Sequence, residues 1–208
     1  MTSDDRWEDA RRIEAWAGEV RVNLIRLAAI IAFYGNHLVQ SYFASDGRSD
    51  SGFHVAVTAI SLAWAASVLA LYVCLSRRYV PPALKYVAVA WDIVMVTAVL
   101  VVAGVPTSTL AVLYFLVIAS APLRLSLPLA YFASLGSMAA YVLFLGYYKY
   151  FLVGVERYPT DPRRLTRADQ VIFVLALGAA GLFAGQMVRQ ARRLAQGYVV
   201  DIEEPREG

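Results

Sequence analysis

Residues 84–104 read LKYVAVAWDIVMVTAVLVVAG, and this stretch decides the fold class. It holds two charged residues, Lys85 near its start and Asp92 further along, within an otherwise largely apolar run. A helix needs about 20 such residues to cross the hydrocarbon core of a bilayer. Because a helix satisfies its backbone hydrogen bonds internally, lipid tolerates it. The stretch therefore predicts a transmembrane helix.

The rest of the chain repeats this pattern. The 208 residues are 59% hydrophobic and only 17% charged, whereas soluble domains are about 25% charged. The alternation of apolar and polar residues that a membrane β-barrel requires is absent. We therefore expect an all-α, polytopic membrane protein with six transmembrane helices, in the runs Val22–Phe43, Val55–Leu75, Leu84–Gly104, Thr109–Leu123, Pro128–Tyr148 and Ala168–Val188.

The basic residues of the short loops predict the orientation. With the N-terminus inside, the cytoplasmic segments carry twelve Lys and Arg residues and the outer segments six. Because Lys and Arg are enriched in cytoplasmic loops, we expect both termini in the cytoplasm, and the chain in a bacterial inner membrane. Met1–Arg21 holds six acids and four arginines without an apolar centre, so we do not expect this segment to be a signal peptide.

Two segments flank the predicted membrane domain, residues 22–188. In residues 1–21, apolar side chains recur at helical spacing, which predicts an amphipathic helix lying on the membrane or packing on a partner. Residues 189–208 are expected to be a cytoplasmic extension of the last helix, basic over Arg189–Gln196, followed by an acidic, disordered tail.

The ends of the last helix carry recognisable signals. Thr166 followed by Asp169 has the spacing of a capping box, which predicts the start of this helix. Gly197 is the expected end of the helix, because glycine commonly terminates helices.

Composition and motifs exclude several classes of function. The single cysteine, Cys74, cannot form a disulfide within the chain, and one cysteine with two histidines cannot complete a Cys/His zinc site. A net charge of +3 does not indicate a nucleic-acid partner, because the basic residues set topology. The chain contains no GxSxG, HExxH or P-loop motif and no inverted repeat typical of transporters. We do not expect an enzyme.

Charged residues within the spans are the first candidate site. Asp92 lies about 12 Å into its helix at ~1.5 Å per residue, where a carboxylate must be protonated or paired with a cation. Arg26 lies in the same leaflet and could pair with it, while Arg124 is expected to snorkel to the interface. The alternatives are a structural ion pair and a switchable proton- or ligand-sensing site.

A second candidate site lies at the outer ends of the first two helices. Asn36 and His37 lie near the end of the first, and His54 begins the second. Helices joined by a short loop bring these residues toward one another. The cluster is expected to be structural, to sense protons or a ligand, or to bind a metal or haem iron through the two histidines.

The last helix carries Gly178, Gly181 and Gly185, and Gly181–Gly185 is a GxxxG pattern. Small residues at this spacing let two helices approach closely in lipid. The pattern fits packing within the bundle and packing across a homodimer equally well.

Part of the sequence resembles a known family. The run Trp91-Asp92-Ile-Val-Met-Val-Thr97, with Gly104 before a short outer loop, and the following Leu113-Tyr114-Phe115-Leu116-Val117-Ile118 resemble the six-helix membrane input region of bacterial sensor histidine kinases of the RegB and PilS type. Related regions anchor some cyclases. The loop Gly104–Thr109 lacks the double glycine and Asn-Pro-Phe that the RegB type carries.

The resemblance implies a sensory or receptor module of a two-component system. Its signal would pass through the last helix to a cytoplasmic output domain or partner, and we expect a homodimer. No phosphoacceptor helix or ATP-binding domain follows Arg193 in this sequence, so the output is expected from another protein or a domain beyond residue 208. The alternatives are a small transporter or channel using Asp92 and Arg26, and a b-type haem protein using His37 and His54. No cofactor is required by the sequence.

Overall fold

The computed structural model describes residues 3–39, 51–77, 83–103, 109–152 and 166–203. Within these residues the regular structure is helical throughout. In chain order the helices are α1 (Ser3–Val39), α2 (Ser51–Ser76), α3 (Leu84–Ala103), η2 (Thr109–Val112), α4 (Leu113–Ser120), η3 (Ala121–Arg124), α5 (Leu127–Tyr147), η4 (Tyr148–Leu152) and α6 (Arg167–Glu203), of which η2 and η3 are 3₁₀ segments and η4 is a π segment.

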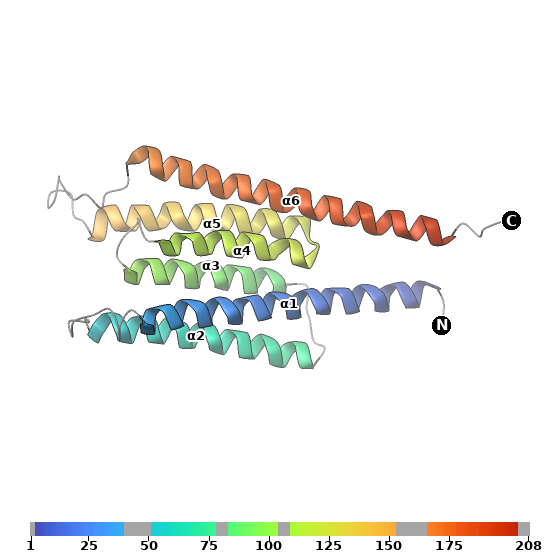
Figure 1. The fold of residues 1–208 in the computed structure, drawn as a ribbon, viewed down its shortest axis with the longest axis horizontal. Coiled ribbons are helices and arrows are strands. Elements are labelled where there is room, and N and C mark those ends of the chain that lie inside the picture. The colour runs from blue at the N-terminus through green and yellow to red at the C-terminus, as the bar shows by residue number, and fades with distance from the viewer. Residues whose placement is uncertain (1–2, 40–50, 78–82, 104–108, 153–165, 204–208) are drawn as a thin grey trace.

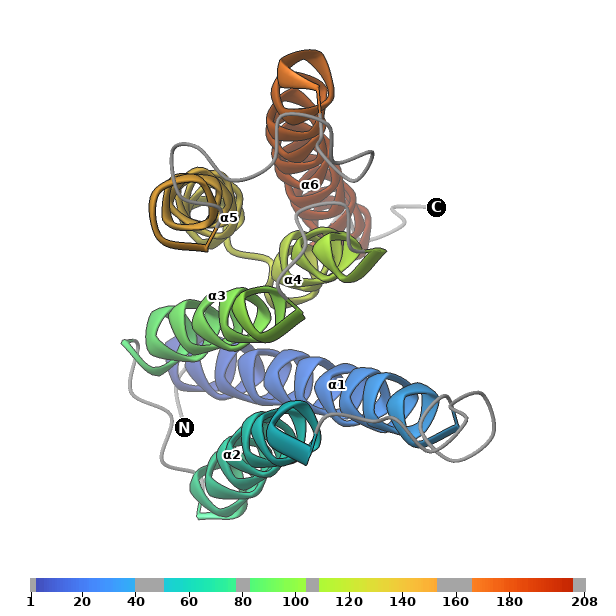
Figure 2. The same cartoon turned by 90° about the vertical axis from the view of Figure 1, so that its left-hand side faces the viewer.

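The helices lie along one common direction and form two groups (Figure 1). Helices α1 and α2 pack on each other at one side of the bundle, and α5 and α6 pack on each other at the other. Helix α3 joins the groups because it packs on both α2 and α5, and α4 fills the space beside α6 (Figure 2). Asp92 on α3 therefore lies in the helix that both groups share.

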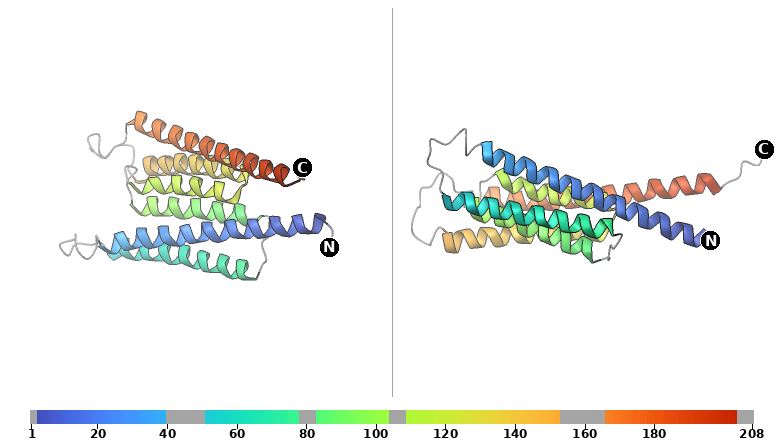
Figure 3. Two further views of the ribbon diagram at one scale, coloured as in Figure 1. Left: turned by 45° about the vertical axis from the view of Figure 1, so that its right-hand side comes forward. Right: turned by 90° about the horizontal axis from the view of Figure 1, so that it is seen from below.

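The first residues of α1 and the last residues of α6 lie at the same end of the bundle, which we call the terminal end (Figure 3). Both helices project past their neighbours there. An even number of crossings brings the two ends of a chain to one side of a membrane, so this arrangement fits six spans.

The lengths and compositions of the helices fit a membrane. Five segments are long and apolar enough to cross it, namely Trp16–Val39, Gly52–Ser76, Leu84–Ala103, Leu127–Phe151 and Arg167–Leu194. The sixth apolar helical segment, Leu110–Arg124, is shorter. Counted from Thr109, where η2 begins, it gains length from its 3₁₀ ends: eight residues rising ~2.0 Å each and eight rising ~1.5 Å give about 28 Å. That reach is close to the ~30 Å hydrocarbon core.

Large apolar side chains cover the outside of the bundle. On α2, Val55, Leu62 and Leu69 recur every seven residues and are each more than 60% exposed. A stripe of this kind on a soluble protein would be an aggregation hazard, whereas in lipid it is the expected outer surface. The protein is a polytopic, all-α membrane protein, as the sequence predicts.

The two signals for the ends of α6 have different outcomes. The capping box is confirmed: the Asp169 amide donates to Thr166 Oγ1 at 3.3 Å, and the Thr166 amide donates to Asp169 Oδ2 at 3.2 Å. The predicted end at Gly197 is wrong, because α6 continues to Glu203. A glycine inside a helix costs only about 1 kcal/mol, which the backbone hydrogen bonds of the following turns can offset.

Two further boundaries differ from the prediction. The fifth span was expected to end at Tyr148, but its helical path continues through the π segment η4 to Leu152. In the N-terminal part of the chain, α1 is one continuous helix. The amphipathic residues before Val22 therefore extend the first span without a break.

Candidate functional site

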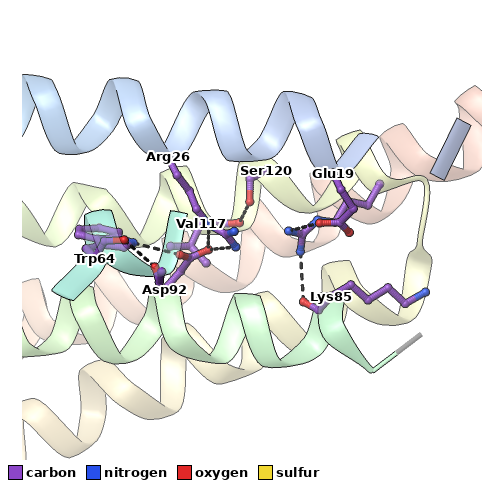
Figure 4. A network of polar contacts seen from close by, with 9 residues as sticks. Glu19, Arg26, Trp64, Lys85, Asp92, Val117 and Ser120 are labelled. Carbon is purple, nitrogen blue, oxygen red and sulfur yellow. Dashed lines mark hydrogen bonds and ion pairs between the residues drawn. The ribbon is translucent and has the colours of Figure 1, made fainter. Parts of the chain in front are cut away.

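The deepest charged residues of α1 and α3 form an ion pair. Arg26 Nε donates to Asp92 Oδ2 at 2.7 Å, and Nη2 of the same guanidinium contacts the same oxygen (Figure 4). The two side chains are only 6% and 5% exposed. The structure thus joins the two residues that the sequence left as possible partners.

The second oxygen of the Asp92 carboxylate is also satisfied. Trp64 on α2 donates from Nε1 to Asp92 Oδ1 at 3.2 Å, and the indole is buried (Figure 4). Trp64 was not among the residues predicted for this site. Its position could have indicated a role in the site. Tryptophan favours membrane interfaces, whereas Trp64 lies near the middle of α2. Three helices therefore meet at one carboxylate.

A second ion pair lies closer to the terminal end. Arg124, the last residue of η3, places Nη2 2.8 Å from Glu19 Oε2 on α1 and donates from Nη1 to the Lys85 carbonyl at 3.2 Å. Its two partners, Glu19 and Lys85, are labelled in Figure 4. The Arg124–Glu19 contact has an ion-pair distance without the angle of a hydrogen bond, and Arg124 Nε has no hydrogen-bond partner among the described residues. The Arg124 side chain is 2% exposed, so the prediction that it snorkels to the interface is wrong.

Helix α1 supplies its contacts from a single face. Glu19, Asn23 and Arg26 are spaced by four and three residues, which places them in one line along a helix. Asn23, between the two charges, donates from Nδ2 to the Val68 carbonyl of α2 at 3.2 Å. This spacing could have revealed Glu19 and Asn23, but Glu19 was assigned to the amphipathic N-terminal segment instead.

We call Glu19, Arg26, Asp92 and Arg124 the charge network. It contains two acids and two bases, all buried in the bundle, so its formal charge is zero. Isolated charges at this depth would each cost several kcal/mol, and pairing removes much of that cost. The two ion pairs therefore strongly favour one relative position of α1, α3 and η3.

The turn at Arg124 also depends on a glycine of α1. A Cβ at Gly18 would lie 2.9 Å from the Leu123 carbonyl oxygen, closer than side chains normally approach backbone. Gly18 therefore lets α1 come close enough for Glu19, the next residue, to reach Arg124.

We expect Gly18→Ala to destabilise the protein by about 1–3 kcal/mol, because the new methyl group meets backbone that cannot rotate away. Gly35→Ala, in the same helix, is the matched control: its Cβ would meet nothing within 4 Å. That change should be neutral or stabilise α1 by about 0.5–1 kcal/mol. Unfolding in mixed micelles measures both, and equal effects would contradict the close approach at Gly18.

The histidines lie at the opposite end of α1 and α2. His37 Nε2 and His54 Nδ1 are 3.0 Å apart, a hydrogen-bond distance, whereas Asn36 is exposed and takes no part in this contact. Two imidazoles on opposite sides of one iron need about 4 Å between their nitrogens, at ~2 Å per metal–nitrogen bond. The contact found here does not fit an iron between these two atoms. Among the described residues, no group of three or more His, Cys, Asp or Glu could hold a metal.

The glycines of α6 face α5. Cβ atoms at Gly178 and Gly185 would lie 3.6 Å from Met138 Sδ and 3.3 Å from the Tyr131 hydroxyl oxygen. A Cβ at Gly181 would overlap the Ser134 side chain, whose Oγ donates to the Leu177 carbonyl at 3.2 Å. Of the two uses that the pattern allowed, the structure shows close packing within the bundle.

The fold and this site define a class: a helical membrane domain held together by paired internal charges, without a soluble domain among the described residues. The family model described as the PilS-like transmembrane domain matches residues 11–194. The chain therefore belongs to the PilS-like transmembrane domain family, in agreement with the resemblance seen in its sequence. Neither the curated proteins nor the solved structures contain a significant match to the chain.

Proposed function

We propose that this domain is a membrane sensory module of the histidine-kinase type, which passes a signal through α6 to a cytoplasmic output domain or partner protein. Membership of the PilS-like family supports the sensory role. The observation that carries the proposal is the charge network, because two buried ion pairs fix the position of α1 against α3 and η3. A buried pair that is strong when formed and costly when broken suits a switch between two states.

The role proposed here is not catalytic. Asp92 has both carboxylate oxygens engaged by Arg26 and Trp64, and Glu19 faces Arg124. Carboxylates held in this way position helices. Under this proposal the signal is a displacement of α6 and not a chemical product.

The test compares the native chain with Asp92→Asn in proteoliposomes. The asparagine side chain is neutral and nearly the same size as that of aspartate, so the pair with Arg26 is broken while the packing is largely kept. Spin labels at the exposed positions Leu62 on α2 and Leu194 on α6 report the position of α6 in a Cys74→Ser background. The proposal predicts a shift of about 1–2 Å, typical of helix movements in switching proteins. An unchanged distance would contradict it, and a proton or ion flux lost in Asp92→Asn would instead support transport.

We propose that the terminal end faces the cytoplasm of a bacterial inner membrane, in line with the excess of Lys and Arg in the segments at that end. A membrane-impermeant thiol reagent should label Thr166→Cys in intact cells and should label Arg193→Cys only after the membrane is opened. Both changes are made with Cys74→Ser, and both positions are exposed. The reverse labelling pattern would contradict this orientation.

We also propose that the module works as a homodimer. Since the glycines of α6 are occupied by α5, a dimer has to use other surfaces. The extension of α6, residues 189–203, contacts the bundle through Arg189 and Arg192, and the end of α6 then projects past the bundle (Figure 3). We choose this projecting end as the dimer contact. Light scattering of the purified protein should give twice the chain mass, and a single chain mass would contradict the dimer.

A further inference from the structure

The turn that leads into α5, made of η3 and the two residues after it (121–126), has an unusual backbone. Leu125 adopts the left-handed conformation, with φ 49° and ψ 30°, and is the non-glycine residue with positive φ among the described residues. This conformation costs a side-chain-bearing residue about 1–2 kcal/mol. The Leu125 amide donates to the Pro122 carbonyl at 2.9 Å, which holds the turn in place.

Consecutive residues of this turn contact different helices. The Leu123 carbonyl lies against Gly18 of α1, and Arg124 contacts Glu19 of α1 and the Lys85 carbonyl of α3. The residue after Arg124 is Leu125, and its carbonyl accepts two hydrogen bonds from Arg192 of α6, from Nε at 3.1 Å and from Nη2 at 2.7 Å. The turn thus bonds to the charge network with one residue and to α6 with the next.

Arg192 binds the turn just beyond the part of α6 that packs on α5. The glycines that bring α6 against α5 end at Gly185, and Arg189 donates to the Tyr131 hydroxyl of α5 at 2.7 Å. Arg192 comes one turn later, within the extension. Its bonds to the Leu125 carbonyl join α6 to the turn at the point where the extension begins.

We propose that Arg192 is the positioning residue that transfers the state of the charge network to the extension of α6. This inference rests on the sensory function proposed above and identifies its route: Asp92 and Arg26 set α1, Glu19 on α1 sets Arg124, and the turn passes that position to Arg192. Leu125 directly follows Arg124, and its amide is bonded to the Pro122 carbonyl, so we expect a movement of Arg124 to move the Leu125 carbonyl with it.

A double-mutant cycle tests this route in the full chain in lipid nanodiscs. Spin labels at Val20 on α1 and Leu194 on α6, both exposed, measure the distance between the network side and the extension. The effect of Asp92→Asn on this distance is measured in the native background, with Arg192→Met and with Arg193→Met. Arg193 is the matched control, because it is an exposed arginine one residue away.

We expect Asp92→Asn to shift the distance by about 1–2 Å in the native and Arg193→Met backgrounds, and to leave it unchanged with Arg192→Met. A purely structural role of Arg192 would change stability but not remove this dependence. If the shift persists with Arg192→Met, or also disappears with Arg193→Met, the route through Arg192 is overturned while the sensory function stands. If Asp92→Asn gives no shift in the native background, both proposals fail. Arg192→Lys keeps the charge without the paired donors and should lose the dependence too.

Discussion

Asp92→Asn is expected to destabilise the protein by about 3–5 kcal/mol, the usual cost of removing one partner from a buried ion pair. The change leaves the Arg26 guanidinium buried at 6% side-chain exposure without a counter-charge. A guanidinium cannot lose its proton to escape this situation. Unfolding of the purified protein in mixed micelles, followed by tryptophan fluorescence, measures the loss.

Arg26→Met should cost clearly less than Asp92→Asn. A carboxyl group left without its cation can take up a proton and become neutral, and Asp92 would keep its hydrogen bond from Trp64. The long methionine side chain also replaces much of the volume of arginine. If the two variants lose equal stability, or if Arg26→Met loses more, then an unpaired Arg26 is not more costly than an unpaired Asp92, and the prediction is wrong.

The second large effect is expected at the crossing of α5 and α6. Gly181→Leu should destabilise the protein by about 3 kcal/mol or more, because the new side chain overlaps Ser134 and forces the two helices apart. Gly181→Ala should have a smaller effect in the same direction, of about 1–3 kcal/mol. The same unfolding measurement applies.

Two variants decide whether this effect comes from the contact with Ser134. Gly178→Ala is the control on the same helix face, since its Cβ would lie at an ordinary 3.6 Å from Met138 Sδ. It should be close to neutral. Ser134→Gly combined with Gly181→Ala should recover most of the stability lost in Gly181→Ala, because the small residue is then on the other helix. If the double variant is no more stable than Gly181→Ala, the loss has another origin.

The spans were predictable because lipid leaves the chain few options. A run such as residues 84–104 must become a helix in a membrane, and α3 begins at Leu84 as expected. The short fourth run was harder to judge, because a uniform rise of ~1.5 Å per residue makes it too short. Its 3₁₀ ends lengthen it, and nothing in the hydropathy of the run indicates them.

The pair of Arg26 and Asp92 was predictable from depth alone. Each lies within a span, both lie in the same leaflet, and a buried charge needs an opposite charge. Arg124 and Glu19 were not predictable in this way, because each lies next to charged or loop residues and fits a solvated position. Their burial depends on the approach of α1 to the turn at Gly18, which only the tertiary structure reveals.

Local patterns predicted that contacts form, but not with which partner. The glycines of α6 indicated a close helix, and the three-dimensional packing selects α5. The two histidines were expected to approach each other and do, but their direct contact was not foreseeable from a loop of unknown path. The glycine at 197 misled because the same residue type ends some helices and is tolerated within others.

The proposed switch depends most on the buried pair of Arg26 and Asp92, and the coupling free energy between these two residues tests that pair directly. The unfolding free energies of the native protein, Arg26→Met, Asp92→Leu and the double variant form a double-mutant cycle. We predict a coupling of at least about 2 kcal/mol, with the double variant more stable than Asp92→Leu alone, because an apolar pair replaces the orphaned charge. Effects that add within about 0.5 kcal/mol would mean that the two residues do not act as a pair, and would contradict a switch built on it.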